Sequence, residues 1–322
     1  MKTVVSTDRA AAVELLRRGE VVALPTETVY GLAGDALNPI AVAKIFEAKG
    51  RPRFDPLIVH LPNREWLEKI ADLPTRGRQL VLRLAEKFWP GPFTMVLPKR
   101  EIVPGIVTAG LETVAIRISA NPSFAQVAKE FGKPLAAPSA NRFGRISPTT
   151  AKHVLDELGG QIPLIIDAGP TTHGIESTIV RVEVEGITIL RRGPITSEQL
   201  SEFGTVGTAK EREKISAPGQ SPSHYAPKTP LRIINDLNWF ESNRRCALLA
   251  WTPTKDDARF AAVRNLSESR DLREAAANLF RHLHDLDSLG LDLIVAERVP
   301  SRGLGAAIMD RLERAAHGSS QK

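Results

Sequence analysis

The part of this chain whose side chains could do the most chemistry is Ala136–Pro148, where an apolar run leads into small polar residues. The polar and cationic residues of this stretch are Ser139, Asn141, Arg142, Arg145 and Ser147. Hydroxyl, amide and guanidinium groups bind phosphate and ribose, and small residues let a ligand approach the backbone closely. The stretch therefore predicts a nucleotide or phosphate site. Ser147-Pro148 is also typical of a helix N-cap, so Ser147 could serve in either way.

Four other segments place polar side chains where a strand or a helix begins or ends. Pro25–Leu32 carries threonines and a glycine after an apolar strand pattern, and the carboxyl ends of strands are the usual ligand side of α/β folds. Lys49–Pro52 follows a helix pattern; the helix dipole explains its lysine but not its arginine. Gly174–Val180 starts a strand with polar residues. The paired arginines of Leu190–Gly193 are either ligand-binding groups or a solvated rim.

The elements that must position these segments alternate between short apolar strands and helical patterns, which predicts an α/β fold. Strands are expected at Glu20–Pro25, Pro56–His60, Thr94–Pro98, Thr113–Ile118, Pro134–Ala137, Pro163–Asp167, Ser177–Val182 and Ile187–Leu190. Asn38-Pro39 at the start and Gly50 at the end mark a helix. A second helix is expected over Thr149–Leu158.

The composition changes after about residue 207, which predicts two domains joined by a linker. Ser216–Pro230 is rich in proline and serine and favours an extended backbone. Beyond it, strands are expected at Pro230–Asn235, Cys246–Trp251 and Asp292–Glu297, and helices at Asp271–Leu286 and Leu304–Ala316. The predicted organisation is a first domain over 1–207, a linker over 208–229 and a smaller α/β domain over 230–322. Asp285 and Asp287 are expected to be solvated.

Composition and charge exclude several classes of protein. The chain has 322 residues, of which 42% are apolar and 25% charged, so disorder is excluded. Its net charge of +6 favours a nucleotide, phosphate or nucleic-acid partner, although an ordinary basic surface explains it equally well. The single cysteine, Cys246, lies in an apolar run and is expected in the core, without a disulfide or a cysteine-rich zinc site. No apolar run reaches the roughly 18 residues of a membrane span, and no signal peptide is visible, so we expect a cytoplasmic protein.

Several common catalytic motifs are absent from the sequence. It contains no G-x-x-x-x-G-K-[ST] phosphate loop, no H-E-x-x-H zinc motif and no G-x-S-x-G elbow, which makes Ser139 a poor hydrolase candidate. Gly303-Leu304-Gly305 is a partial dinucleotide fingerprint that tight helix packing explains better. No dedicated metal site is therefore expected.

Together, these segments resemble the YrdC-like family of L-threonylcarbamoyladenylate synthases, in its long form with a C-terminal domain. The resemblance spans nearly the whole chain and rests on Pro25–Leu32, Lys49–Pro52, Phe88–Pro92, Ala137–Pro148, Gly174–Val180, Leu190–Gly193 and His224–Pro227. It implies a twisted open α/β sheet domain linked to a smaller Rossmann-like domain. It also implies that L-threonine, bicarbonate and ATP give threonylcarbamoyl-AMP and pyrophosphate. A separate transfer machinery then modifies an adenosine of certain tRNAs, and contact of this chain with tRNA is a further implication.

The side chains of these segments suit the implied reaction. N-carboxy-threonine attacks the α-phosphate of ATP with its own carbamate oxygen, so the protein needs no nucleophile. It needs alignment of the two substrates, worth on the order of 7–11 kcal/mol in ideal cases, and positive charge around the transferring centre. Mg²⁺ is expected to arrive with ATP, held mainly by the phosphates.

The resemblance also implies roles for individual residues. The threonine pocket would be lined by Thr28, His60, Arg117, Ala137 and Ser177, with the Arg117 guanidinium pairing with the threonine carboxylate. The implied ATP-binding residues are Arg51, Asp55, Thr113, Ser139, Asn141, Ser147, Arg191 and Tyr225. Lys49 and Arg51 are the implied catalytic cations.

Three positions depart from the family pattern. Asp55 stands where the family usually has asparagine, and its charge would repel phosphate, which leaves ribose or magnesium as its partner. Arg192 stands where the family usually has proline, and Ser223 where it tends to have arginine. Arg192 could replace the cation that is missing at Ser223.

The proline-rich linker contains an imidazole and a phenol that a spacer would not need. His224-Tyr225 therefore predicts a lid over the nucleotide, with a plain spacer as the alternative. Two other functions stay open. An RNA-binding module suits the basic charge, but only 5% of the residues are aromatic. A carbamoyl-transferring maturation factor would usually carry zinc-finger cysteines, which this sequence lacks.

Overall fold

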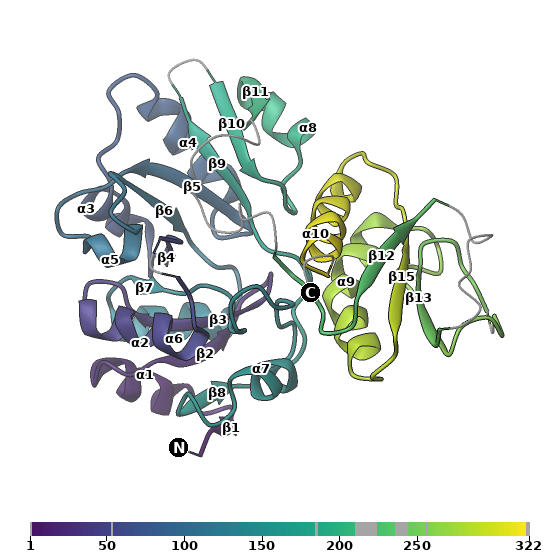
Figure 1. Cartoon of the computed structure of the whole chain (residues 1–322). Coiled ribbons are helices and arrows are strands. Elements are labelled where there is room, and N and C mark those ends of the chain that lie inside the picture. The colour runs from purple at the N-terminus through teal and green to yellow at the C-terminus, as the bar shows by residue number, and fades with distance from the viewer. Residues whose placement is uncertain are drawn as a thin grey trace.

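The chain forms two β-sheets (Figure 1). The structure is a computed structural model, and it describes residues 2–52, 54–183, 186–209, 224–235, 244–255 and 257–319. The larger sheet belongs to the first two thirds of the chain and the smaller one to the last third. Strands alternate with helices in both parts, so the predicted α/β class is confirmed. Among the described residues, no helix is both long enough and apolar enough to cross a membrane.

Among the described residues, the first sheet contains eleven strands in the order β1-β8-β2-β3-β7-β4-β6-β5-β9-β10-β11. Their bounds are β1 Val4–Ser6, β2 Val22–Pro25, β3 Tyr30–Asp35, β4 Ile58–His60, β5 Phe93–Pro98, β6 Thr113–Arg117, β7 Leu135–Ala136, β8 Leu164–Ile166, β9 Thr178–Val182, β10 Gly186–Arg191 and β11 Thr205–Thr208. The sheet is mixed, since β2 and β3 are antiparallel whereas β4 and β6 are parallel. The β4–β6 register places His60 directly beside Arg117, where both strands end.

Helices cover both faces of this sheet. Their bounds are α1 Arg9–Arg17, α2 Pro39–Lys49, η1 Arg64–Trp66, α3 Leu67–Ile70, α4 Arg78–Phe88, α5 Gly105–Thr108, α6 Pro122–Phe131, α7 Ala151–Leu158, α8 Ser197–Leu200 and η2 Ser201–Phe203. Side chains of successive strand residues point to opposite faces. Accordingly, Val22 and Leu24 of β2 pack in one cluster with α1 and α6, and Ala23 packs in another with α2 and α4.

The helix ends show where local sequence signals hold and where they fail. Asn38 Oδ1 accepts hydrogen bonds from two N–H groups of the first turn of α2, and Gly50 closes that helix at φ 57°. Both ends are as predicted. The N-cap of α7 is Thr150 and not Ser147, whose predicted capping role is therefore wrong. The Ser147 hydroxyl makes a contact elsewhere, with Glu176.

The strand β3 is an element that the sequence pattern does not predict. Its two glycines lower the β propensity of the segment. A Cβ added at Gly31 would lie 3.3 Å from the Ala137 Cβ, and one at Gly34 would lie 3.2 Å from Ile45 Cδ1, so both mark a close approach of neighbouring chain. As a result, the polar residues 26–29 form the tip of the β2–β3 hairpin.

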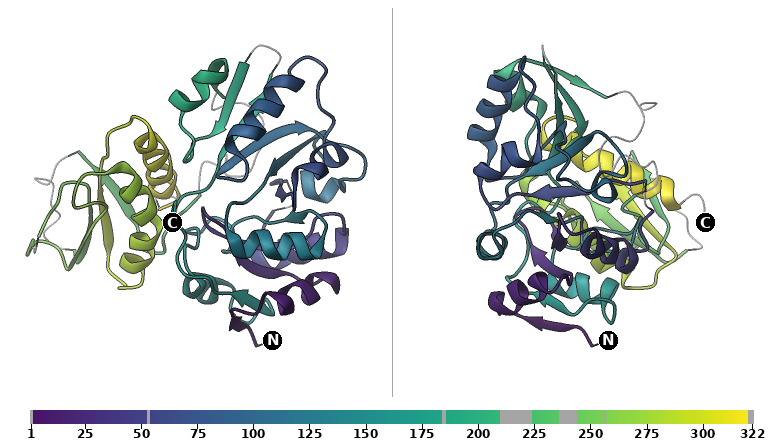
Figure 2. Two further views of the ribbon diagram at one scale, coloured as in Figure 1. Left: turned by 180° about the vertical axis from the view of Figure 1, so that it is seen from behind. Right: turned by 90° about the vertical axis from the view of Figure 1, so that its left-hand side faces the viewer.

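The second sheet is parallel throughout, in the order β12-β15-β13-β14. Its elements are β12 Leu231–Ile234, β13 Cys246–Ala250, β14 Ala262–Asn265, α9 Leu272–Asp287, β15 Leu293–Glu297 and α10 Leu304–Ser319. The helices α9 and α10 lie between this sheet and the first domain (Figure 2). Their apolar cluster also includes Val29, Ile146, Ile175 and Tyr225. The two parts of the molecule therefore share one apolar interface.

Three expectations about single residues of the C-terminal part can be compared with the structure. Cys246 is buried in the core, as predicted. A Cβ on Gly305 would lie 1.8 Å from the Pro300 carbonyl oxygen, so tight packing accounts for this glycine. The expectation that Asp287 is solvated is wrong, because its Oδ1 accepts a hydrogen bond of 2.7 Å from the Thr229 N–H. Asp287 thus ties α9 to the chain that enters the second sheet.

Only the end of the predicted linker can be described. Residues 210–223, including Ser223, lie outside the described residues. From His224 on, the chain runs beside the first domain, where the Ala226 N–H donates to the Gly144 carbonyl oxygen at 2.9 Å. The segment then enters β12 at Leu231.

Candidate active site

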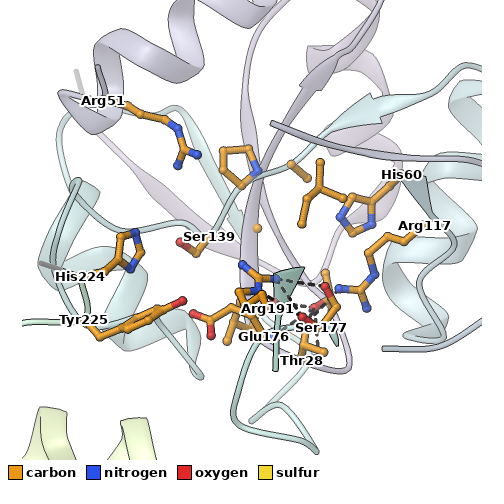
Figure 3. Close-up of a pocket in the computed structure, with 16 residues that line it drawn as sticks. Thr28, Arg51, His60, Arg117, Ser139, Glu176, Ser177, Arg191, His224 and Tyr225 are labelled. Atoms are coloured by element: carbon orange, nitrogen blue, oxygen red, sulfur yellow. Dashed lines mark hydrogen bonds between the residues drawn. The ribbon is translucent and has the colours of Figure 1, made fainter. Parts of the chain in front are cut away.

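One pocket collects most of the side chains that the sequence analysis singles out (Figure 3). It lies where β4 and β6 meet the β2–β3 hairpin, and the segment before β9, the end of β10 and the end of the linker complete it. Its empty space, including the open mouth, is about 520 Å³. The predicted site residues that line it are Thr28, Arg51, His60, Arg117, Ala137, Ser139, Ser177, Arg191 and Tyr225.

Thr28, His60 and Arg117 form what we call the Arg117 end of the pocket, where Arg117 pairs with Thr28. Arg117 Nη1 donates to Thr28 Oγ1 at 3.2 Å, and its Nη2 donates to a carboxylate oxygen of Glu27. Its buried Nε has no hydrogen-bond partner among the described residues. Arg117 is therefore held in one orientation and keeps a donor for an anionic ligand such as a carboxylate.

The ionisation of the Arg117 end follows from burial and from Arg117 itself. Burial would raise the pKa of the Glu27 carboxyl, but Arg117 and Ser119 more than offset this effect, so its pKa lies below the usual value. Glu27 is thus an ionised counter-ion. Burial and the nearby charge of Arg117 hold the pKa of His60 well below its usual range, which keeps the imidazole neutral. The His60 ring packs on Phe124 with 4.7 Å between ring centroids.

Ser177 also lines the pocket and binds Arg191. Its Oγ accepts a hydrogen bond of 3.1 Å from Arg191 Nη2 and is 2.8 Å from Thr94 Oγ1. Arg191 also donates to the Ser177 carbonyl oxygen through Nε and Nη2, at 3.2 and 3.0 Å. Arg191 is only 8% exposed, which contradicts the solvated-rim alternative. The neighbouring Arg192 is not among the residues that line the pocket.

The opposite side, which we call the Arg51 end, is formed by Arg51, Ser139, His224 and Tyr225. Arg51 Nε donates to the Asp55 carbonyl oxygen at 3.2 Å. Its Nη2 lies 2.9 Å from Asp55 Oδ2, an ion pair without hydrogen-bond geometry. The Tyr225 backbone has φ 65°, a left-handed conformation that is uncommon for residues other than glycine. Its surroundings therefore have to hold the phenol in place.

Burial also determines the ionisation of the two linker side chains. It raises the pKa of Tyr225 to about 12, so the phenol stays protonated, and its oxygen has no hydrogen-bond partner in the described part of the chain. Burial and the charges of Arg51 and Lys49 lower the pKa of His224 well below its usual value, so its imidazole is neutral. Both side chains therefore cover the pocket without adding charge.

Five predicted site residues do not line the pocket: Lys49, Asp55, Thr113, Asn141 and Ser147. Lys49 Nζ donates to the carbonyl oxygens of Ser139, at 2.6 Å, and of Asn141. Burial holds the pKa of Lys49 well below its usual value. Asn141 Nδ2 donates to two further carbonyl oxygens of the same loop, at 2.8 and 2.9 Å. Lys49 and Asn141 thus shape the wall that presents Ser139.

Thr113 and Asp55 lie behind the Arg51 end. Asp55 is buried and faces Arg51, as described above. Thr113 is half-buried at the start of β6. Because Ile58 pairs with Ala115 in parallel register, Thr113 lies at the end of the sheet where the chain leaves Asp55. The two residues therefore share a location, but neither is part of the pocket surface.

Glu176 and Arg311 are residues of this region that the prediction of site residues omits. Glu176 lines the pocket; its Oε1 accepts from Ser147 and its Oε2 accepts from Arg311 Nε at 3.0 Å. An acidic residue inside the motif Gly174–Val180 is a signal that could have identified it. Arg311 carries no such signal, since a charged residue on an amphipathic helix usually faces solvent.

Comparisons with known families cover nearly the whole chain. A family model described as telomere recombination, named after Sua5, YciO and YrdC, matches residues 14–193. A second family model, described as the C-terminal domain of threonylcarbamoyl-AMP synthase, matches residues 195–317.

Individual relatives agree with these matches. A threonylcarbamoyl-AMP synthase of Bacillus subtilis is 41% identical over 96% of this chain and 93% of its own. The crystal structure of Pyrococcus abyssi Sua5 complexed with L-threonine has a TM-score of 0.90 at 35% identity, covering 99% of this chain and 98% of that one. A threonylcarbamoyl-AMP synthase of Vibrio vulnificus is 36% identical over 48% of this chain and 82% of its own. This chain therefore belongs to the family of threonylcarbamoyl-AMP synthases, the enzymes that make this adenylate from ATP for tRNA modification.

Proposed function

We propose that the pocket binds L-threonine at its Arg117 end and ATP at its Arg51 end. The observation that carries this proposal is that one buried pocket holds Arg117 on one side and Arg51 on the opposite side (Figure 3). Arg117 has a buried Nε without a partner among the described residues, and a carboxylate is the ligand group that fits a guanidinium best. The relative from P. abyssi, whose structure was determined with L-threonine, supports the assignment.

In the proposed reaction, the amine of threonine and bicarbonate form a carbamate with loss of water. A carbamate oxygen then attacks the α-phosphorus of ATP, so one P–O bond forms while the bond to the β-phosphate breaks and pyrophosphate leaves. The protein supplies alignment of the two substrates and positive charge around the transferring centre. Figure 3 shows Arg191 between Arg51 and Arg117, and it is the guanidinium placed to stabilise that charge.

The linker side chains complete the site by covering it. His224 and Tyr225 are buried against the pocket and both are neutral. Neutral groups avoid repelling the triphosphate, and their burial excludes water from an adenylate that water would hydrolyse. This arrangement supports the prediction of a lid, although most of the linker, residues 210–223, lies outside the described residues.

Magnesium would enter the site as part of the ATP complex. No group of three or more His, Cys, Asp or Glu side chains that could hold a metal ion occurs in the described ranges. Asp55 Oδ2 is a buried carboxylate oxygen without a hydrogen bond, and Mg²⁺ usually keeps one or two carboxylates besides phosphates and water. The donor set therefore fits a magnesium ion held mainly by the triphosphate. Asp55 lies behind the pocket surface and pairs with Arg51, so it would have to turn toward the pocket to bind the ion. When bound, the ion would neutralise phosphate charge.

The product is an activated acyl group that a separate transfer machinery would pass to tRNA. We place this activity in the cytoplasm, where ATP and tRNA are found together. The net charge of +6 supports direct contact with tRNA, and filter binding at increasing salt concentrations, with and without ATP, tests it. Tight binding of RNA without synthase activity would favour the RNA-binding alternative.

Pyrophosphate release by the purified full-length chain tests the proposed function. We expect release from ATP only when L-threonine and bicarbonate are both present, and formation of threonylcarbamoyl-AMP in equal amount. L-Serine should be a substrate about 10- to 200-fold poorer, because the pocket can distinguish it only by one methyl group. Equal release without threonine would exclude the proposed reaction.

A further inference from the structure

Arg311 reaches from the C-terminal part of the molecule into the first domain. It lies on α10, yet its side chain is completely buried. Its Nε donates to Glu176 Oε2 at 3.0 Å, a contact between residues 135 positions apart. Its Nη1 donates to Asp310 Oδ2 at 2.8 Å. Arginine is almost never fully buried without a partner, so the burial of Arg311 at this interface depends on its pairing with Glu176.

The same guanidinium group packs on Tyr225. The guanidinium carbon of Arg311 lies 5.2 Å from the centroid of the Tyr225 ring, within the range of a cation–π contact. Phe280 of α9 also contacts this ring, with 5.4 Å between centroids. Tyr225 is thus held by side chains from two helices of the C-terminal part, in a backbone conformation that it would otherwise rarely adopt.

Two of the partners of Arg311, Glu176 and Tyr225, line the pocket, whereas Arg311 itself does not. Figure 3 shows Glu176 and Tyr225 among the pocket side chains. Glu176 in turn accepts a hydrogen bond from Ser147, one of the predicted ATP-binding residues. Arg311 is therefore connected to the Arg51 end of the pocket through Tyr225 and Glu176. It contacts none of the residues that form the Arg117 end.

Arg311 also controls the ionisation of Glu176. Burial alone would raise the pKa of this carboxyl, but the positive charges of Arg311 and Arg191 lower it below its usual value. Glu176 is therefore ionised and holds the Ser147 hydroxyl as a donor. Without Arg311, burial would favour the protonated acid, and Ser147 would lose its charged acceptor.

We propose that Arg311 is a positioning residue for the synthase reaction, which holds Tyr225 and Glu176 in the geometry that ATP requires. The C-terminal domain thereby contributes directly to nucleotide binding. This inference rests on the proposed assignment of ATP to the Arg51 end of the pocket. A purely structural role for Arg311 would instead lower stability and affect both substrates alike.

Replacement of Arg311 by methionine tests the proposal, because methionine keeps much of the length of the side chain and removes its charge. In Arg311→Met we expect the KM for ATP to rise about 10- to 100-fold, since a misplacement of about 1 Å can cost that much. The KM for threonine should stay within about twofold. Glu313→Gln on the same helix is the matched control, because the Glu313 carboxylate is exposed and accepts a hydrogen bond of 3.3 Å from the exposed Arg298. Its kinetic constants should equal those of the parent chain.

Arg311→Lys separates the two contacts of Arg311. Lysine keeps a positive charge for Glu176 but cannot stack a planar group on Tyr225, so we expect an intermediate KM for ATP. Thermal unfolding shows whether Arg311→Met folds. If it does not fold, Arg311→Lys is the variant that tests the proposal. Full activity of Arg311→Lys would exclude the contribution through Tyr225. Unchanged constants in both variants, or an equal rise of the KM for ATP and threonine, would overturn the proposal.

Calorimetric binding of a non-hydrolysable ATP analogue and of threonine separates this inference from the proposed function. Weaker binding of the analogue in Arg311→Met, with unchanged binding of threonine, supports the role of Arg311 even if the parent chain shows no synthase activity. In contrast, the parent chain could be an active synthase while Arg311→Met binds the analogue as tightly as the parent does. That result would exclude the positioning role and leave the proposed function intact.

Discussion

The two ends of the pocket are built differently. At the Arg117 end, Arg117 and Thr28 come from the first domain and bind each other, and Glu27 of the same hairpin is the counter-ion. At the Arg51 end, Tyr225 comes from the linker and is held by Arg311 and Phe280 of the C-terminal part. One end is thus complete within a single sheet domain, and the other is assembled from three regions of the chain.

This difference suggests that the Arg117 end selects the substrate, whereas the Arg51 end closes the pocket over the nucleotide. A preorganised end can select a small amino acid without moving, because its donors are already oriented. An end assembled by packing between domains can change when these domains separate, and so can couple nucleotide binding to the C-terminal part. Ligand binding at the two ends should therefore respond differently to the same perturbation.

The largest effect is expected from removing the C-terminal part. All eleven strands of the first sheet lie before residue 209, so a fragment 1–209 should fold. Because it lacks His224 and Tyr225, we expect it to bind ATP at least about 100-fold more weakly than the full chain, and threonine within a fewfold. Calorimetry with both ligands measures this. The full-length double variant His224→Ala/Tyr225→Ala is the control for the linker alone, and an equal loss of both ligands would contradict the comparison.

A large effect is also expected from Arg117→Ala. This change leaves Glu27 buried without its counter-ion, so the free energy of unfolding should fall by about 3–5 kcal/mol. The variant should also lose most of its affinity for threonine. Chemical denaturation and threonine calorimetry check both effects. In the double variant Arg117→Met/Glu27→Gln, stability should largely return while threonine affinity does not; recovery of both would disprove the assignment.

Arg51→Ala should have a smaller effect on ligand binding, confined to ATP. It should also lower stability, because the buried Asp55 loses its counter-ion. A charge-assisted contact is worth about 1.5–3 kcal/mol, which corresponds to a rise of about 10- to 100-fold in the KM for ATP. The KM for threonine should hardly change, because Arg51 forms contacts with Asp55 and not with residues of the Arg117 end. Steady-state kinetics with each substrate varied in turn decide this. A parallel rise of both KM values would show that the two ends are not separate.

The smallest effect concerns pH and the stacked histidines His153 and His284, which join α7 to α9 with 3.9 Å between ring centroids. Burial lowers the pKa of His153 to about 4 and that of His284 to about 3, whereas unfolded histidines titrate near 6.5. Between these folded pKa values and about 6.5, the unfolded chain therefore binds more protons than the folded chain does. The stability that this pair contributes is complete above about pH 6.5 and is lost as the pH falls toward 4 and 3.

This pH effect should appear at the Arg51 end first, because His284 Nε2 lies 3.2 Å from the Ser147 carbonyl oxygen. We expect ATP affinity to weaken below about pH 6 before threonine affinity does, with stability falling by on the order of 1 kcal/mol per pH unit. Calorimetry and denaturation between pH 5 and 8 measure both quantities. His153→Gln should flatten the stability profile; an unchanged profile would exclude the histidine pair as its cause.

Much of the fold could be predicted from local patterns. The caps of α2 at Asn38 and Gly50 act over a few residues, and β13 of the second sheet is a continuous apolar run, Cys246–Ala250. The strand β14, Ala262–Asn265, contains no such run, and the sequence pattern does not predict it. The hairpin strand β3 could not be predicted, because its glycines are explained only by the neighbours Ala137 and Ile45 that they approach. Local propensity does not record such neighbours.

The prediction of the site from local sequence patterns was incomplete for the same reason. The residue types in the motifs of the sequence identified most of the pocket, including the two arginines Arg117 and Arg51. They did not distinguish Lys49, which supports the wall from behind, from side chains that face the pocket. Whether a cation points into a cavity depends on which backbone carbonyl groups surround it, and these come from a segment 90 residues away.

By itself, the sequence determined the α/β class, the ends of α2 and the chemical groups that gather in the pocket, since each of these follows from side-chain type and short-range spacing. The tertiary structure alone decided that Ser147 binds Glu176, 29 residues away, and that Glu176 binds Arg311, 135 residues away. The second contact exists because α10 packs against the first domain and places a buried positive charge beside a buried carboxylate. Burial makes that pairing necessary, and only the packing of the two domains determines which residues are buried together.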